Sequence, residues 1–414
     1  MRRLNNWVGP LLFGLLIYVS VDNYGYSMHG YNRQVAGYVF IAAATLLLFA
    51  TLTGRRFVNL KPTLPFAVAL ATSLAISTWN AANPGLAINR LPLYYAVALL
   101  GIGFYLAHRD DETNPVWRYF TVVPLVHMVF LVYVIFYLIR IQSEPDPTFR
   151  WFPNFANIRH FAYFGFISAA CATSLFALTR KLQSTAFVLT TASLFGIVVL
   201  GARGALLAWV VYAACFALFC ERRTRFLLFC AAAVVVASAV VFYLGETGLL
   251  RTPSLFVWLE PGGSGFMVTD RLAIWLDALR AIIARPFFGY GAEGYITSRC
   301  CNPHVSQPHN FILQFLLEFG LVGVALMVAT AWAMIRTCGG VKALWVNLHS
   351  EPGFLAVSSV LAGFFAYALI DGLFYYAIPL THFALFAALL LSGMSKGERG
   401  QIPSCNPTFD LKSA

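Results

Sequence analysis

Long apolar runs, separated by short polar segments, recur along almost the whole 414-residue chain. An α-helix needs about 20 predominantly apolar residues to cross the hydrocarbon core of a bilayer. Twelve runs approach that length, at residues 7–21, 35–53, 63–79, 90–107, 117–139, 159–178, 184–200, 204–220, 226–244, 309–335, 353–370 and 374–393. We therefore predict an all-α integral membrane protein with about twelve transmembrane helices, in which residues 1–414 form a single polytopic membrane domain.

One long segment, residues 245–308, interrupts the pattern of apolar runs. Proline and glycine recur in it, which marks turns and breaks rather than a spanning helix, and a helix-like stretch lies between them. We predict that this segment is one large loop outside the membrane and that it contains short helices.

The composition supports a membrane location. The chain is 59% hydrophobic and only 11% charged. Soluble domains carry about 25% charged residues, so this chain lacks the surface charge of a soluble protein. We expect membrane lipid around it and no nucleic-acid partner.

The lysines fix the orientation. In a twelve-span arrangement with both termini in the cytoplasm, every lysine falls on the cytoplasmic side (Lys61, Lys181, Lys342, Lys396 and Lys412). This is the positive-inside distribution of membrane proteins. It predicts that both termini are cytoplasmic and that the 245–308 loop lies on the opposite, outer side.

The arginines are distributed differently from the lysines. In the same arrangement, eleven of the 23 lie outside or near the outer membrane face: Arg33, Arg90, Arg140, Arg150, Arg159, Arg203, Arg251, Arg271, Arg280, Arg285 and Arg299. The planar guanidinium binds phosphate oxygens through two parallel hydrogen bonds. The bias predicts a phosphate or pyrophosphate ligand at this face, although ion pairs and lipid headgroup contacts remain alternatives for each arginine.

Residues 269–286 show the pattern of an amphipathic helix, with Thr269 or Asp270 as its cap and Pro286 at its end. Arg271 then falls in the first turn, at the edge of the apolar stripe. A helix N-terminus attracts anions, and an arginine there adds to the attraction. The alternative is an interfacial helix whose arginine reaches up to the lipid headgroups.

Residues 286–295 carry glycines at 289, 291 and 294, which predict a flexible backbone that can approach another segment closely. The spacing is superficially that of a nucleotide-binding loop. No strand pattern precedes it and no P-loop lysine follows it, so we reject that interpretation.

Pro308 and His309 precede the tenth apolar run. We expect Pro308 in the first turn of a helix that begins near His309. From residue 309 to residue 333 such a helix is roughly 37 Å long, more than the hydrocarbon core, so His309 would lie at the membrane surface beside the loop. Histidine titrates near neutral pH and can accept a proton from a hydroxyl, whereas the alternative is an ordinary interfacial histidine. His304 and His160 are the competing candidates.

Two further arginines lie at the outer ends of apolar runs. Arg159 opens one run, and Arg203 lies in the Gly201-Ala202-Arg203-Gly204 turn between two others. Charges at that depth are costly and usually functional, and the glycines leave room for a ligand. A snorkelling arginine is again the alternative.

A metal site is not indicated. Cys300, Cys301, His304 and His309 are near one another in the chain, but their spacing fits no standard zinc site. We also find no acidic cluster suited to magnesium, so we expect neither a metal nor another cofactor.

Four motifs follow one another between residues 269 and 323. They are Asp-Arg-x-x-x-Trp at 270–275, Pro-x-x-Gly-x-Gly at 286–291, Pro-His-Asn at 308–310 and Leu-x-x-Leu-x-Glu-x-Gly at 313–320. In order and spacing, and with about twelve spans and a late outer loop, the chain resembles the O-antigen ligase and polymerase superfamily of bacterial inner-membrane proteins.

The chain's size and single dominant loop are most similar to the ligase branch. That resemblance implies transfer of O-antigen polysaccharide from undecaprenyl pyrophosphate to a sugar hydroxyl of lipid A–core oligosaccharide at the periplasmic face. Two branches remain as alternatives: O-antigen polymerases, which typically have two large outer loops, and O-linked protein oligosaccharyltransferases, which usually have a longer C-terminal region. Here the loop at 141–158 is short, so the chain lacks the second large outer loop that is typical of the polymerases.

The resemblance and the chemistry of the residues predict the same mechanism. Arg203 and Arg271, with Arg159 as a third contact, would bind the pyrophosphate and stabilise it as it leaves. His309 would take the proton of the acceptor hydroxyl. The transfer would invert the anomeric centre without a metal. A secondary transporter or lipid-linked glycan flippase is the more distant alternative, disfavoured because central span positions are mostly apolar.

Overall fold

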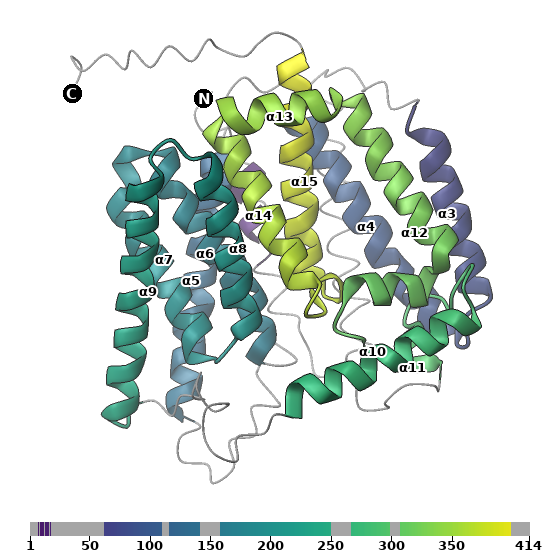
Figure 1. Ribbon diagram of the computed structural model, residues 1–414, viewed down its shortest axis with the longest axis horizontal. Helices are drawn as coiled ribbons and strands as arrows, with labels where there is room; N and C mark the ends of the chain where they lie inside the picture. The colour runs from purple at the N-terminus through teal and green to yellow at the C-terminus, as the bar shows by residue number, and fades with distance from the viewer. Residues whose placement is uncertain are drawn as a thin grey trace.

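The computed structural model describes residues 62–109, 116–140, 158–249, 266–298 and 307–398, and some single residues between 7 and 17. Within these ranges every regular element is a helix (Figure 1). The fold is therefore all-α in the part of the chain that is described.

Ten helices follow ten of the twelve predicted apolar runs. They are α3 (Leu64–Trp79), α4 (Pro84–His108), α5 (Val116–Arg140), α6 (Ile158–Leu178), α7 (Gln183–Val199), α8 (Arg203–Phe219), α9 (Arg223–Glu246), α12 (Phe311–Thr337), α14 (Pro352–Ala368) and α15 (Ala377–Glu398). The predicted span at 35–53 lies outside the described residues, and the one at 7–21 is described only in part.

Seven helices of the described ranges are long and apolar enough to cross a membrane, and an eighth is if a bent pair counts as one span. That pair is α13 (Gly340–Ser350) and α14, which meet at 112°. α3 and α8 are apolar but shorter. The chain thus has the character of a multi-pass membrane protein, while the number twelve stays a prediction.

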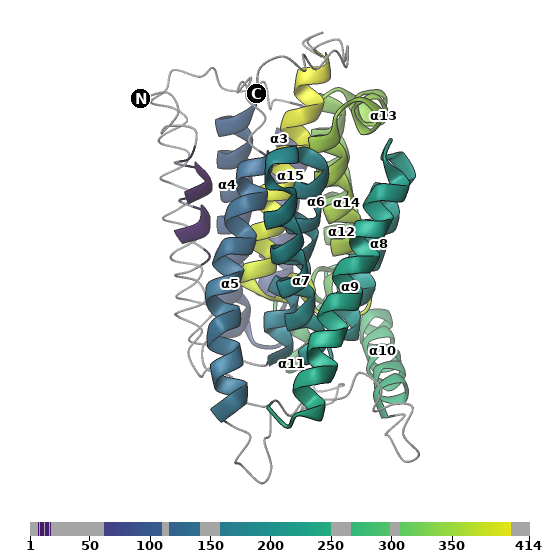
Figure 2. The same ribbon diagram turned by 90° about the vertical axis from the view of Figure 1, so that its left-hand side faces the viewer.

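The long helices run side by side in one bundle (Figure 2). α6 is at its centre, with 83% of its membrane-length stretch buried, whereas α9 is at the periphery with 22% buried. α6 packs on α7 and α5, and α14 packs on α8. Aromatic, aliphatic and alanine side chains fill the core between them, and buried hydroxyls such as those of Ser168 and Ser193, 2.7 Å apart, join α6 to α7.

Two further helices, α10 (Phe266–Ala284) and α11 (Gly294–Thr297), lie within the predicted outer loop. α10 runs across one end of the bundle, at the opposite end from α13 (Figure 1). α13 contains Lys342, so that lysine and the 266–298 segment lie on opposite sides of the bundle. The predicted arrangement also has Lys342 and this segment at opposite ends of the bundle.

α10 begins earlier than predicted. Its first residue is Phe266 rather than a residue after Thr269 or Asp270, so Arg271 lies in the second turn and not the first. The N-terminal dipole therefore contributes less at Arg271 than the sequence suggested. The helix is fixed instead by packing of Ile274, together with two alanines, on Leu317 of α12.

α12 is broken at Gly320, whose φ of 66° and ψ of −176° are not helical. The break frees two backbone N–H groups, and the loop after α10 accepts both. Leu321 donates to the carbonyl of Pro286 over 2.7 Å, and Val322 donates to that of Phe287 over 3.1 Å. In a membrane such groups must find a partner inside the protein.

The carbonyls before the break are satisfied by the same loop. Leu317 and Glu318 accept from the N–H groups of Tyr290 and Gly291, over 2.9 and 2.8 Å. Gly289 lies so close to these carbonyls that a Cβ would collide with them. The predicted close approach of this segment is therefore present, but the segment is docked along α12 and is not a free loop.

Candidate functional site

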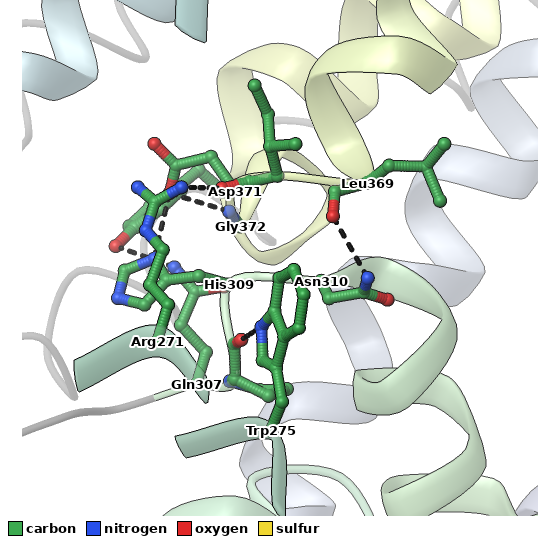
Figure 3. A network of polar contacts seen from close by, with 11 residues as sticks. Arg271, Trp275, Gln307, His309, Asn310, Leu369, Asp371 and Gly372 are labelled. Atoms are coloured by element: carbon green, nitrogen blue, oxygen red, sulfur yellow. Dashed lines mark hydrogen bonds and ion pairs between the residues drawn. The ribbon is translucent and has the colours of Figure 1, made fainter. Parts of the chain in front are cut away.

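The candidate site forms where three segments meet at the end of the bundle that carries α10 (Figure 3). One is the stretch 307–310 before α12, the second is the flank of α10 with Arg271 and Trp275, and the third is the turn 369–372 after α14. These segments contribute the residues described below.

His309 lies immediately before α12, in a left-handed backbone conformation with φ of 52°. Asn310 is the N-cap, and its side-chain oxygen accepts from the N–H groups of Ile312 and Leu313 over 3.0 and 3.1 Å. The prediction that the helix starts at His309 with Pro308 in its first turn is therefore wrong. His309 is presented from a turn that the asparagine cap closes.

Asp371 is the direct partner of His309. Nδ1 of His309 lies 2.8 Å from Oδ1 of Asp371, and the same oxygen accepts the N–H of Gly372 over 2.8 Å. The phenol of Tyr163, from α6, also forms a hydrogen bond with the carboxylate. The His309 side chain is 31% exposed and that of Asp371 15%, so the imidazole is reachable while the carboxylate is largely covered.

The Asp371 carboxyl is held in its charged form. Burial by itself raises its pKa, but the His309 and Gly372 hydrogen bonds and the nearby Arg271 charge outweigh burial and lower the pKa to about 2. An ionised carboxylate only accepts hydrogen bonds, so Nδ1 of His309 must be the donor. In a neutral imidazole this leaves Nε2 unprotonated and able to accept a proton.

Arg271 borders this pair. Its Nη1 donates to the carbonyl of Ile370, the residue before Asp371 (Figure 3). Its guanidinium is one of the charges that lower the pKa of Asp371. The structure thus brings Arg271 and His309 together, although 38 positions separate them in the sequence.

Arg203 approaches the same turn from α8. It is the first residue of that helix and is exposed, and Gly201 before it has a φ of 62°. A Cβ on Gly204 would lie 2.8 Å from Cε2 of Tyr367 and 3.5 Å from Cδ1 of Ile370. The glycine therefore allows the start of α8, which carries Arg203, to pack against the end of α14 and the turn that carries Asp371.

Arg159 lies in the first turn of α6, but its side chain is outside the described residues, as is that of His160. Tyr163, one turn further on, contacts Asp371, so this end of α6 faces the site. His304, Cys300 and Cys301 also lie outside the described residues. Among the residues that are described, no group of three or more metal-binding side chains comes together.

A second polar cluster is fully buried beside the site. Nε of Arg90 lies 3.6 Å from Oε1 of Glu293, and Arg90 also donates to the carbonyl of Tyr375. The Tyr375 hydroxyl donates to Oε2 of Glu293 over 2.5 Å. These contacts connect α4, the start of α11 and the short helix η4 (Leu373–Tyr375).

Several of the predicted outer arginines therefore have protein partners. Arg90 is only 1% exposed and paired with Glu293, Arg280 pairs with Asp277 over 3.0 Å, and Arg285 donates to the carbonyl of Asn80 over 3.0 Å. These three therefore make the intramolecular contacts that the sequence left open as an alternative. Arg271 likewise donates to a backbone carbonyl, that of Ile370, but it lies beside the His309–Asp371 pair.

Sequence reasoning missed Asp371. The signal was an acid followed by glycine, directly after a predicted span and on the outer side of the proposed topology. Ionisable residues in such positions are rarely incidental.

The comparison with known families agrees with the motifs. The model of the O-antigen ligase family matches residues 185–328, about a third of the chain, which includes Arg203, Arg271 and His309. This match confirms the resemblance to the O-antigen ligase superfamily predicted from the sequence. No curated protein matches the chain.

Proposed function

We propose, because residues 185–328 form a domain of the O-antigen ligase superfamily, that this chain is a lipid-linked oligosaccharide glycosyltransferase. Its donor is O-antigen polysaccharide on undecaprenyl pyrophosphate, and its acceptor is a sugar hydroxyl of lipid A–core oligosaccharide. The reaction takes place at the periplasmic face of the bacterial inner membrane. The observation that carries the proposal is the His309–Asp371 pair with Arg271 beside it.

His309 is the base in this mechanism. Asp371 accepts the Nδ1 proton and so leaves Nε2 to take the proton of the acceptor hydroxyl. The acceptor oxygen then attacks the anomeric carbon of the donor while the bond from that carbon to the phosphate oxygen breaks. The undecaprenyl pyrophosphate leaves with the bonding electrons, and the anomeric centre inverts. The imidazolium that forms is stabilised by the Asp371 carboxylate until it returns its proton to solvent.

Arg271 and Arg203 stabilise the leaving pyrophosphate, with Arg159 as a third contact. Fixed cationic donors directed at developing charge are among the strongest catalytic devices available to a protein. They need no metal, and guanidinium forks fit phosphate oxygens in two-point geometry. Arg271 already donates to the carbonyl of Ile370, which fixes the direction of its side chain before the donor arrives.

A polymerase or an O-linked protein oligosaccharyltransferase would use the same groups on a different acceptor. The purified protein should therefore be incubated with undecaprenyl-pyrophosphoryl glycan and with three acceptors in turn: rough lipopolysaccharide, a second donor molecule and an acceptor protein. Glycan on lipid A–core supports the ligase. Longer glycan on the lipid carrier, or glycan on the protein, would show that one of the other branches is right.

A transporter or flippase would have a polar residue at the middle of a span and a broken helix. Both are present here, but each is packed against other parts of the protein, which argues against that class. His127, at the middle of α5, is an exception to the mostly apolar span centres, and its ring stacks on Phe161 with centroids 4.6 Å apart. The break in α12 at Gly320 is filled by residues 286–291. Broken helices of transporters line a binding cavity instead. Glycan transfer by the purified protein in detergent, where nothing is transported, would exclude this class.

A further inference from the structure

The backbone of His309 is in a left-handed conformation that residues other than glycine rarely adopt. Its φ is 52°, and within the described ranges Glu293 is the other non-glycine residue with a positive φ. Such a conformation persists only where the surrounding structure fixes it. The direction of the imidazole therefore depends on the groups that hold the peptides on either side of His309.

The peptide before His309 is held by Trp275. The indole Nε1 donates to the carbonyl of Pro308 over 2.9 Å (Figure 3). That carbonyl belongs to the peptide bond that joins Pro308 to His309, so the hydrogen bond acts directly on the rotation that places His309. Asn310 holds the other side, because its side-chain nitrogen donates to the carbonyl of Leu369 over 2.9 Å.

The two segments that carry His309 and Asp371 also pack tightly against one another. Gln307 is 1% exposed, and its Nε2 lies 3.4 Å from the hydroxyl of Tyr376. Its amide fills the space beside Gly372, where a Cβ would collide with it. The N–H of Gly372 in turn donates to the Asp371 carboxylate. Residues 307–310 and 369–372 therefore pack closely against one another. The Pro308 carbonyl accepts its hydrogen bond from a different segment, through Trp275.

Trp275 comes from the same helix as Arg271, one turn later. Residues four apart lie on one face of a helix. α10 therefore makes two hydrogen bonds across the site, from Arg271 to the turn that carries Asp371 and from Trp275 to the turn that carries His309. A single helix thus contributes to the spacing between the arginine proposed to bind pyrophosphate and the histidine proposed as the base.

We propose that Trp275 is a positioning residue for His309: its indole N–H fixes the Pro308 carbonyl and thereby the left-handed turn that directs the imidazole at the acceptor hydroxyl. This inference rests on the proposed function, since it assigns His309 the role of base. Trp275 touches neither donor nor acceptor in this role and acts through the backbone alone.

The test is Trp275→Phe, which keeps an aromatic ring and removes the N–H. We expect turnover to fall at least about tenfold while the Michaelis constant for the donor changes less than about twofold, as for loss of an interaction that matters only in the transition state. The matched control is Trp332→Phe in α12, where the side chain is 51% exposed and turnover should stay unchanged.

A double-mutant cycle separates positioning from a general structural role. If Trp275 acts through His309, Trp275→Phe should alter the residual turnover of His309→Ala by less than about twofold. An equally large loss in both backgrounds would overturn the inference. Full turnover of Trp275→Phe would also overturn the inference, if the wild type is active and His309→Ala loses activity as proposed.

A readout without activity keeps this inference separate from the proposed function. The chain has eight histidines, and the ring-nitrogen signal of His309 in a histidine-labelled sample is the one that His309→Ala removes. Trp275→Phe should shift that signal and Trp332→Phe should leave it in place. An unshifted signal in Trp275→Phe would refute the positioning role even if the protein proved to transfer no glycan.

Discussion

Nδ1 of His309 and Oδ1 of Asp371 lie 2.8 Å apart, although the two residues are 62 positions apart in the chain. His309 precedes α12 and Asp371 follows α14, so the pair closes only when these two helices pack with η4 between them. The hydrogen bond selects the imidazole tautomer that leaves Nε2 as an acceptor. An imidazole with Nε2 unprotonated can accept a proton, as the proposed role of His309 requires.

His309→Ala should fold and still bind donor, but lose transfer by about 10²–10⁴-fold, which is the usual contribution of a general base. The measurement is turnover against pH, with His304→Ala beside it. If His309→Ala kept wild-type turnover while His304→Ala did not, the base would have been assigned to the wrong histidine.

Asp371→Asn should lower turnover by at least about tenfold, since losing the carboxylate partner of a catalytic histidine costs up to roughly 10⁴-fold. The Asp371 carboxyl has its pKa lowered to about 2, so it stays charged at neutral pH and cannot cause a fall in activity there. An acidic limb near neutrality in the wild type must therefore come from another group. Wild-type turnover of Asp371→Asn would show that the charge is not needed.

The same lowered pKa makes a prediction for stability. A carboxyl whose pKa is about 2 in the folded chain and 3.8 otherwise stabilises the fold above about pH 4 and loses that contribution as the pH falls towards 2. Thermal unfolding in detergent should show Asp371→Asn less stable than wild type at pH 6, with the difference shrinking at acidic pH. A difference that grew on acidification would have the wrong sign.

Arg271→Lys and Arg203→Lys should each impair transfer, because lysine keeps the charge but loses the planar fork. Arg280→Lys on the same helix as Arg271 is the matched control: Arg280 is exposed and paired with Asp277, so activity should stay near normal. Near-normal transfer by both Arg271→Lys and Arg203→Lys would count against two-point phosphate binding.

Activity should also survive metal chelation, and a loss that magnesium restores would point to another mechanism.

Gly320→Ala and Gly289→Ala should destabilise the protein strongly, because a Cβ at either position collides with backbone of the facing segment. Gly340→Ala is the control: Gly340 also has a positive φ, of 67°, but nothing lies within 4 Å of its added Cβ. It should cost only the local strain of roughly 1–2 kcal/mol. Equal midpoints of thermal unfolding for Gly320→Ala and Gly340→Ala would mean that the docking of the loop on α12 contributes little.

The topology can be tested by labelling introduced cysteines with a membrane-impermeant reagent, against the background of the parent protein. A cysteine at Gly263 should react in cells with an intact inner membrane, and a cysteine at Lys342 only after permeabilisation. Residue 263 lies outside the described residues, so this rests on the distribution of lysines. The reverse pattern would invert the proposed orientation.

Hydrophobic patterning in the sequence was enough to predict the ten helices that follow apolar runs in the described ranges, and local motifs were enough to choose candidate groups. Hydropathy is a local property of about 20 consecutive residues, so the bounds of α5 and α7 differ from the predicted runs by only one residue at each end. The order of short motifs, which is also local, led to the superfamily and included Arg271 and His309, while Arg203 was predicted from its place in the turn between two apolar runs. Even the close approach of the 286–291 segment followed from its glycines.

Only the tertiary structure decided which groups meet. Asp371 could not be assigned to His309 from the chain, since the contact spans 62 positions and depends on how α12 and α14 pack. The sequence placed Arg90 among the possible phosphate ligands, but in the structure it is buried and paired with Glu293. The helix start at 311 instead of 309 is different, because the Asn310 cap that sets it is a local signal that the prediction overlooked, whereas the contacts of Trp275 and Asn310 with distant segments depend on the packing. Pairings of this kind are set by packing, to which distant parts of the sequence contribute jointly, and no local pattern encodes them.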